Sequence, residues 1–265
     1  MKQNIKHFNL NQIGRSGQCF RWEQLGEDTW QIHALVRRQE SVTKEITGTD
    51  MQLTASQRGE EIELSCTEEE FEKYWKRYFD LTTDYEQIEE TGHAFQDPVL
   101  EEAMQFGNGM RILRQDFWET MVSFLISQNN NIPRIKGAIA KLCMCQGKFP
   151  LPQEILERDL ESCRLGYRDK YLKAAAQWMM VKKQAGEESP EAGFAGHLSE
   201  IQGVGPKVEA CIRLYGLHDL SFCPMDTWMK RIVREDYENV IPQWMNSPYA
   251  GYFQQVCFYA KRLNG

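Results

Sequence analysis

The sequence predicts an α+β protein, in which an N-terminal antiparallel β subdomain is followed by a mostly α-helical body. Short runs rich in β-branched and aromatic residues fill the chain up to residue 66. A helix-start signal then appears at Thr67, and apolar residues recur at helical spacing from there onward. With 265 residues, of which 42% are hydrophobic, the chain is long and apolar enough to bury a substantial core.

The predicted strands are short and lie in the first quarter of the chain. Ile62, Leu64 and Cys66 alternate with polar neighbours, which is typical of an antiparallel strand with one buried face. Composition predicts the other strands in the same way, so that the set covers residues 17–22, 29–37, 41–47 and 61–66.

Helix predictions begin with a capping box, in which Thr67 and Glu70 satisfy each other's backbone donors. Residues 117–127 are apolar nearly all round and predict a buried helix, and Pro133 starts the next one. Further helices are predicted over residues 154–163, 168–185, 191–200, 206–216, 226–234 and 249–262, with a surface turn at 186–190. We place the N-terminal β subdomain with a trailing helix at 1–95 and the helical body at 96–265. The helical body is expected to comprise two subdomains, with the active site at their interface.

The formal net charge of −7 is unevenly distributed. Residues 60–102 hold fifteen acidic and three basic side chains, a net of −12 that leaves +5 for the remainder. Residues 129–149 hold four basic side chains and no acid, and residues 164–183 hold six against one aspartate. Because charges are screened beyond about 8 Å at physiological salt, the local face decides which partners bind, and DNA binding is compatible with the total.

The eight cysteines show no metal-binding spacing, and nothing in the sequence indicates export, so we expect reduced thiols. No apolar run approaches the length of a membrane span, and the first residues do not form a signal peptide.

Residues 201–208, Ile-Gln-Gly-Val-Gly-Pro-Lys-Val, are the most informative segment. Gly203 and Gly205 leave backbone amides uncovered, and Pro206 suits the first position of a helix. The amides and the helix dipole predict an anion site, for which a phosphodiester is the obvious ligand. Lys207 lies at the positive end of the dipole, which favours the uncharged, nucleophilic amine. A dinucleotide-binding loop is the less favoured alternative, and a helix–hairpin–helix whose lysine only touches phosphate is the other.

Asp226 follows nineteen residues after Lys207, at the end of a proline-containing loop and before an apolar-periodic helix. An aspartate here is, on its own, most often a helix N-cap. The dipole also keeps such a carboxylate ionised, so that it can stabilise a cation developing at a sugar carbon. The combination with Lys207 therefore indicates a catalytic pair.

These residues resemble the helix–hairpin–helix DNA glycosylases, the HhH-GPD superfamily, and more closely the 8-oxoguanine DNA glycosylases. Matching stretches occur in the family's order at residues 16–22, 113–116, 127–135, 165–168, 201–208 and 248–252. The resemblance implies a TATA-binding-protein-like β subdomain ahead of the HhH-GPD body. It also implies a bifunctional glycosylase/AP lyase that flips out and excises 8-oxoguanine opposite cytosine, and nicks the strand by Schiff-base β-elimination.

The resemblance further implies roles for single residues. Lys207 would be the nucleophile and Asp226 the electrostatic stabiliser. The Gly17 carbonyl would read N7 of the damaged base, Cys211 and Phe258 would sandwich that base, and Gln254 would read its Watson–Crick edge. Tyr167 would be the wedge that fills the gap in the helix. The estranged cytosine would be held by Asn129, Arg134 and Arg168, and the DNA phosphate by the amides around Gly203, Gly205 and Val208.

Each of these roles has a structural alternative. Gly17 could occupy a β-bulge, Cys211 and Phe258 could be core residues, and Tyr167 could pack inside. At least one of the three asparagines at 129–131 is expected to cap the following helix. Trp228 stands where the family often has a histidine, which leaves a phosphate contact there open.

The expected partner is double-stranded DNA containing 8-oxoguanine, bound by a monomer with no membrane association. No cofactor or metal is required, although a structural alkali or alkaline-earth ion at the hairpin backbone fits the resemblance. The expected location is cytoplasmic and nucleoid-associated in a prokaryote, or nuclear in a eukaryote. Two other functions stay open from sequence, namely a glycosylase of the same fold for another damaged purine and a non-catalytic DNA-binding module.

Overall fold

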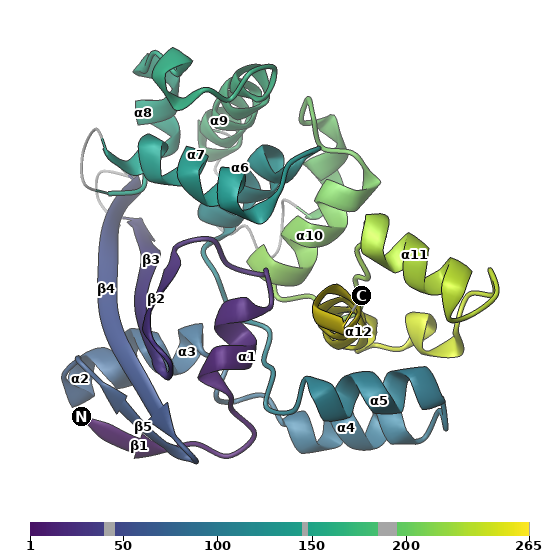
Figure 1. Ribbon diagram of the computed structural model, residues 1–265. Coiled ribbons are helices and arrows are strands. Elements are labelled where there is room, and N and C mark those ends of the chain that lie inside the picture. The colour runs from purple at the N-terminus through teal and green to yellow at the C-terminus, as the bar shows by residue number, and fades with distance from the viewer. Residues whose placement is uncertain (40–45, 145–147, 185–194, 265) are drawn as a thin grey trace. The chain divides into compact units, whose positions relative to one another are not determined.

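The computed structural model describes residues 1–39, 46–144, 148–184 and 195–264 (Figure 1). The chain forms two compact units. Unit 1 comprises Met1–Ile32, Leu53–Arg114 and His218–Gly265, and unit 2 comprises His33–Gln52 and Gln115–Leu217. The chain therefore passes between the units four times. The boundary between residues 95 and 96 that the sequence suggested stays a prediction.

The N-terminal part forms an antiparallel sheet, which confirms the predicted fold class. Among the described residues the sheet has five strands in the order β1-β5-β4-β3-β2. The pairs β1–β5, β4–β5 and β2–β3 are antiparallel. In β5, Ile62 and Leu64 are buried while Glu61 and Glu63 are exposed, as the alternation predicted. The strands are β1 (Lys2–Asn4), β2 (Trp22–Gly26), β3 (Thr29–Gln39), β4 (Ile46–Arg58) and β5 (Glu61–Leu64).

The strand predicted over residues 17–22 is wrong. A helix, α1 (Leu10–Arg15), precedes this segment, and β2 begins only at Trp22. The Gln18 side chain is fully buried, where it donates to the Arg111 carbonyl at 2.9 Å and accepts from the Leu113 amide at 2.8 Å. These bonds to a distant segment hold the backbone in an irregular path.

The third predicted strand, 41–47, lies mostly outside the described residues. Residues 46 and 47 belong to β4, which continues to Arg58 and is much longer than predicted.

The capping box at Thr67 is confirmed. Its hydroxyl accepts from the Glu70 amide at 3.2 Å, and a Glu70 carboxylate oxygen accepts from the Thr67 amide at 2.9 Å. The helix that starts there continues through a π-helical turn at Phe71–Trp75. Elsewhere in the same unit, α12 packs against both α5 and α11. The helices of unit 1 after α1 are α2 (Glu68–Glu70), α3 (Lys76–Tyr78), α4 (Tyr85–His93), α5 (Pro98–Phe106), α11 (Thr227–Glu235) and α12 (Ala250–Asn264).

Apart from its parts of β3 and β4, unit 2 is helical around a buried centre. Every residue of α6 (Phe117–Ser127) before Ser127 is buried, as predicted, and α10 packs along it. Figure 1 shows α6, α7 and α9 clustered, with α10 beside α6. The remaining helices are α7 (Ile132–Met144), α8 (Pro152–Glu157), α9 (Arg168–Gln184) and α10 (Pro206–Gly216), with 3-10 turns at Glu161–Cys163 and Ala195–Glu200.

Two helix predictions in unit 2 need correction. The helix predicted over 154–163 ends at Glu157, because the Lys173 ammonium binds the carbonyls of Leu156 and Arg158 at 2.8 and 2.6 Å. In the segment 191–200, residues 195–200 form a 3-10 turn and residues 191–194 lie outside the described residues. The turn predicted at 186–190 and residue 185 also lie outside them. No described helix is long and apolar enough to cross a membrane.

Candidate active site

The hairpin before α10 requires glycine at one of its two glycine positions. Gly203 has a φ of +94°, and a Cβ atom there would collide with the ring of Tyr171. Gly205 has an ordinary φ of −96°, and a Cβ atom there would meet nothing within 4 Å. Gly203 thus lets the backbone pack on an aromatic ring, while Gly205 leaves open space in front of the helix.

The amino end of α10 has no side-chain cap. Gly205 is the N-cap residue, and Pro206, which has no amide hydrogen, occupies the first helical turn. The amides of Lys207 and Val208 lie in that turn, where an α-helix supplies no acceptor of its own. With the positive end of the helix dipole, backbone amides in such a turn can bind an anion.

Lys207 is half-buried and rests on an aromatic pair. Its Nζ lies 5.3 Å from the ring centroid of Phe124, and that ring stacks on Tyr215 with centroids 5.2 Å apart. The ring face stabilises an ammonium, whereas the helix dipole opposes one. Cys211 lies one turn further along α10 and is buried.

Asn129, Tyr167 and Arg168 are brought together in unit 2. Asn129 has a φ of +48°, and its Nδ2 donates to the Tyr167 hydroxyl at 3.1 Å. The Arg168 guanidinium donates to the carbonyls of Gln128 and Asn129, and its carbon lies 4.6 Å from the Tyr167 ring centroid. Tyr167 is 45% exposed, which excludes the core alternative and leaves its ring available for stacking.

Arg134 stands at the start of α7 with an exposed side chain. Its amide donates to the Asn131 side-chain oxygen at 3.0 Å, so Asn131 has the capping role expected for at least one asparagine. Asn130 binds back to the Ile126 carbonyl at 3.2 Å. Of the three asparagines, only Asn129 directs its side chain to Tyr167.

The sequence did not single out Tyr171, which links the hairpin to this cluster. Its ring lies under Gly203 and makes an edge-to-face contact with Tyr167, with centroids 5.5 Å apart. The signal was present, because Tyr167 directly precedes α9 and Tyr171 follows it by about one helical turn.

Asp226 is the N-cap of α11, as the simpler interpretation predicted. Its Oδ1 accepts from the Met229 amide at 2.8 Å. Burial raises the pKa of the neighbouring Cys223 thiol to about 12, and the negative charge of Asp226 adds to this. Trp228 is half-buried beneath the Arg231 guanidinium, whose carbon lies 5.6 Å from the ring.

Gly17 and Gln254 belong to unit 1. Gly17 has a φ of +82° and lies in the irregular segment after α1, not in a β-bulge. The carbonyl before it, that of Ser16, accepts from the Gln255 amide group at 2.9 Å, which ties this segment to α12. Gln254 is 2% exposed, and among the described residues its Oε1 has no hydrogen-bond partner. A buried, unpaired amide oxygen is suited to receive a donor from a ligand.

Phe258 lies one turn after Gln254 on α12 and is half-buried. The Arg262 guanidinium carbon lies 5.2 Å from its ring centroid, and Arg262 also donates to the Arg15 carbonyl at the end of α1. Phe258 is therefore less buried than a core residue, whereas Cys211 in unit 2 fits either interpretation.

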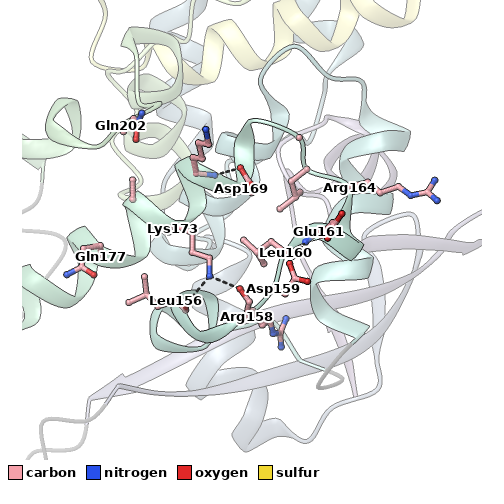
Figure 2. Close-up of a pocket in the computed structure, with 14 residues that line it drawn as sticks. Leu156, Arg158, Asp159, Leu160, Glu161, Arg164, Asp169, Lys173, Gln177 and Gln202 are labelled. Carbon is pink, nitrogen blue, oxygen red and sulfur yellow. Dashed lines mark hydrogen bonds between the residues drawn. The ribbon is translucent and has the colours of Figure 1, made fainter.

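A groove of about 1010 Å³ runs beside the segment that carries Tyr167 (Figure 2). Figure 2 shows Lys173 pointing to the end of α8, where it binds two carbonyls. The groove is lined by side chains of both charges, with Arg158, Arg164, Lys170 and Lys173 on the basic side. The acidic residues are Asp159, Glu161 and Asp169.

The described residues contain no group of three or more His, Cys, Asp and Glu side chains that could hold a metal.

A family model described as 8-oxoguanine DNA glycosylase, N-terminal domain, matches residues 1–121. The structure of MBOgg1 in complex with a low-affinity DNA ligand is 34% identical, covers 100% of this chain and 96% of its own, and has a TM-score of 0.81. The Clostridium acetobutylicum 8-oxoguanine glycosylase/lyase, in complex with double-stranded DNA containing cytosine opposite 8-oxoG, is 29% identical. It covers 99% of this chain and 94% of its own, with a TM-score of 0.81.

Among curated proteins, the N-glycosylase/DNA lyase of Saccharomyces cerevisiae is 32% identical over 159 residues, which is 49% of this chain and 42% of that protein. The match to the N-glycosylase/DNA lyase OGG1 of Arabidopsis thaliana covers 43% of that protein. The chain thus spans less than half the length of these two relatives.

Proposed function

The chain belongs to the 8-oxoguanine DNA glycosylase family, and we propose that it excises 8-oxoguanine opposite cytosine in duplex DNA and then nicks the strand. The observation that carries this proposal is Lys207 in the first turn of α10, behind an uncapped hairpin. A helix start of this kind binds a phosphate and holds an amine beside it. A glycosylase that uses only water needs no lysine there.

The Lys207 amine attacks C1′ of an everted nucleotide. A bond forms between Nζ and C1′ while the bond from C1′ to N9 breaks, and the base leaves with that electron pair. Opening of the sugar ring gives an iminium, which acidifies the C2′ proton. Loss of this proton expels the 3′ phosphate by β-elimination. Both strand cleavage and base release therefore pass through one lysine.

Asp226 stabilises the positive charge that develops at C1′. Its position as N-cap of α11 supports this role, since the helix dipole and the Met229 amide favour the ionised carboxylate. The pairing of Lys207 with Asp226 is part of the proposal.

Recognition of the damaged base falls to four residues. The Gly17 carbonyl accepts from the hydrogen at N7, which guanine lacks. The buried, unpaired Oε1 of Gln254 reads the Watson–Crick edge, and Cys211 and Phe258 lie on the two faces of the base. The irregular segment at Gly17 supports this assignment better than a strand would.

The opposite strand is held by the cluster around Tyr167. Tyr167 enters the gap left by the everted base, since its exposed ring already rests on Arg168 and Tyr171. Asn129, Arg134 and Arg168 bind the estranged cytosine, and the amides near Gly203, Gly205 and Val208 bind a phosphate of the lesion strand.

No cofactor enters this chemistry, and an alkali or alkaline-earth ion bound by hairpin carbonyls would only hold the backbone to DNA. The enzyme acts as a monomer on duplex DNA, in the nucleoid or the nucleus.

Borohydride trapping on an 8-oxoguanine duplex tests the proposal. The wild-type protein should give a covalent adduct that Lys207→Gln abolishes and Lys73→Gln, an exposed lysine in the acidic segment, retains. Base release without an adduct would indicate water chemistry, and binding without release would indicate a non-catalytic module. Repeating the assay with all four opposite bases tests Arg134→Ala, which should weaken the preference for cytosine. An unchanged preference would contradict that assignment.

A further inference from the structure

A fully buried carboxylate in unit 1 binds the two residues at which the chain leaves and re-enters that unit. The Nε of Arg114 lies 2.6 Å from Asp80 Oδ1, and the Nε2 of His218 lies 3.0 Å from Asp80 Oδ2. Asp80 is 0% exposed. The second segment of unit 1 ends at Arg114 and the third begins at His218. The carboxylate of Asp80 thus binds Arg114 and His218, although these two residues are about a hundred positions apart in sequence. The short segments that connect Arg114 to α6 and His218 to α10 and α11 are called links below.

The other groups around Asp80 fix its position. The hydroxyls of Thr83 and Tyr85 donate to its two carboxylate oxygens at 2.8 and 2.9 Å, and Arg111 donates to its carbonyl at 2.9 Å. Its φ of +54° is held by these contacts. Burial alone would raise the pKa of Asp80, but the hydrogen bond and charge of His218 and the charge of Arg114 outweigh it and lower that pKa. The carboxylate is therefore a fixed, ionised anchor.

The links that start from this anchor are short. Asp116, two residues after Arg114, caps α6 by accepting from the Glu119 amide at 3.0 Å. Leu217, directly before His218, donates its amide to the Ile212 carbonyl at 3.1 Å in the last turn of α10. Two residues separate Arg114 from α6, and one residue separates His218 from α10.

The His218 link leads to Asp226. The same Nε2 of His218 that faces Asp80 lies 3.1 Å from the Ile112 carbonyl, so this nitrogen carries the proton and donates to both oxygens. The following loop is tied to α12 by the Gly251 amide, which donates to the Leu220 carbonyl at 2.7 Å. Asp226 comes eight residues after His218.

We propose that Asp80 is a positioning residue of the glycosylase reaction, which acts by holding Arg114 and His218 on one carboxylate and thereby fixing the segment that carries Asp226. This inference rests on the proposed function. Because Asp80 is fully buried, its role is not a direct contact with DNA or base. Its contribution is to hold His218, and with it the first residue of the segment that leads to α11, at one fixed point of unit 1.

The test is Asp80→Asn, which keeps the shape of the side chain and removes its charge. Single-turnover excision at a temperature where circular dichroism shows a folded protein should fall about 10- to 100-fold, the usual effect of a small misplacement. Affinity for lesion-containing DNA should stay at the wild-type value. Amide hydrogen exchange in residues 218–226 should become faster. Wild-type excision, or wild-type exchange in that segment, would overturn the proposal.

Asp97→Asn is the matched control. Asp97 is an N-cap in unit 1 that accepts from the amides of Val99 and Leu100 and from the Tyr237 hydroxyl beyond the end of α11. It hydrogen-bonds to neither Arg114 nor His218. Its variant should excise at the wild-type rate once folded. An equal loss in both variants would mean general destabilisation and would also overturn the proposal.

A second pair keeps the test decisive if Asp80→Asn does not fold. His218→Ala should lower excision, and His218→Gln, whose amide can donate to the same carboxylate, should restore part of it. Equal activity of these two variants would contradict the proposed positioning role of Asp80. A wild-type protein without any excision would refute the proposed function itself. If the wild type is active and Asp80→Asn and His218→Ala are equally active, only the role of Asp80 is refuted.

Discussion

The helices that carry the two proposed catalytic residues begin in opposite ways. At α11, Asp226 caps the helix with its own side chain, and its Oδ1 accepts from the Met229 amide at 2.8 Å. At α10, Gly205 provides no side-chain cap, and Pro206 removes one of the amide donors. One helix start is closed on itself and the other is open to an external acceptor.

This difference separates two uses of the same dipole. A capped start applies the positive end of α11 to an internal carboxylate and keeps it charged. An uncapped start leaves the positive end of α10 without a carboxylate of its own, and in the proposed function a phosphate binds there. A protein that must bind an anion at one helix and keep an anion at another therefore needs glycine in one place and aspartate in the other.

The largest effect is expected from removing the charge while keeping the cap at α11. Asp226→Asn should lower single-turnover excision about 100-fold, because one electrostatic stabiliser of the transition state is lost. Asparagine is an equally good N-cap, so the free energy of unfolding, measured by thermal denaturation, should change by less than about 0.5 kcal/mol. Asp226→Ala should match the loss of activity and also cost about 1 kcal/mol of stability. If excision falls only in step with stability, Asp226 is a structural cap.

Next in size is the contrast between the two hairpin glycines. Gly203→Ala should destabilise the protein by about 2 kcal/mol or more, through its left-handed φ and its collision with Tyr171. Gly205→Ala should change stability by less than about 0.5 kcal/mol, because a poorer cap and a stiffer unfolded chain oppose each other. Urea unfolding measures both. Equal losses would show that Gly203 does not need its special conformation.

The third effect is a change in DNA affinity, expected when the uncapped start of α10 is given a side-chain cap. Gly205→Asp gives α10 the same kind of cap as α11, and the open space at this position accommodates it. Stability should rise by about 0.5–1 kcal/mol, and affinity for DNA should fall about tenfold, since the new carboxylate occupies the amides and repels phosphate. Gly205→Ala is the control in a fluorescence-anisotropy titration. Unchanged affinity would remove the hairpin from the DNA interface.

The smallest effect concerns Cys223, beside the start of α11. Because burial and the charge of Asp226 raise the pKa of this thiol to about 12, its alkylation at pH 8 should be slow and should accelerate as the pH approaches that value. In Asp226→Asn the pKa should fall, so alkylation at pH 8 should be about two- to threefold faster. Peptide mass spectrometry resolves the site. An unchanged rate would mean that the carboxylate is not charged in the free protein.

Much of this contrast could be predicted from local sequence. The bounds of α10 and α6 were predicted to the residue, because Gly-Pro begins the one and the other is apolar on every face. The N-cap role of Asp226 was also predicted from its position at the end of the proline-containing loop. Features of this kind depend on neighbours in sequence, so one sequence is enough to identify them.

The predictions that were wrong, and the features that were not predicted, concern contacts between residues distant in sequence. The segment at Gly17 has the composition of a strand, but Gln18 binds backbone groups almost a hundred residues away. The end of α8 is set by Lys173 from the next helix. The anchor at Asp80 joins three segments that no local pattern connects. The roles assigned to single residues toward DNA and base stay predictions.

The interleaved course of the chain also constrains how the protein is made. Unit 1 includes β1 near the first residue and α12 near the last, and the Gln255 side chain binds the Ser16 carbonyl across 239 positions. A nascent chain on the ribosome therefore cannot complete this unit until its final helix emerges, whereas most of unit 2 is already synthesised. Folding of unit 1 should then follow the synthesis of α12, and removal of α12 should yield an aggregation-prone product rather than a stable fragment.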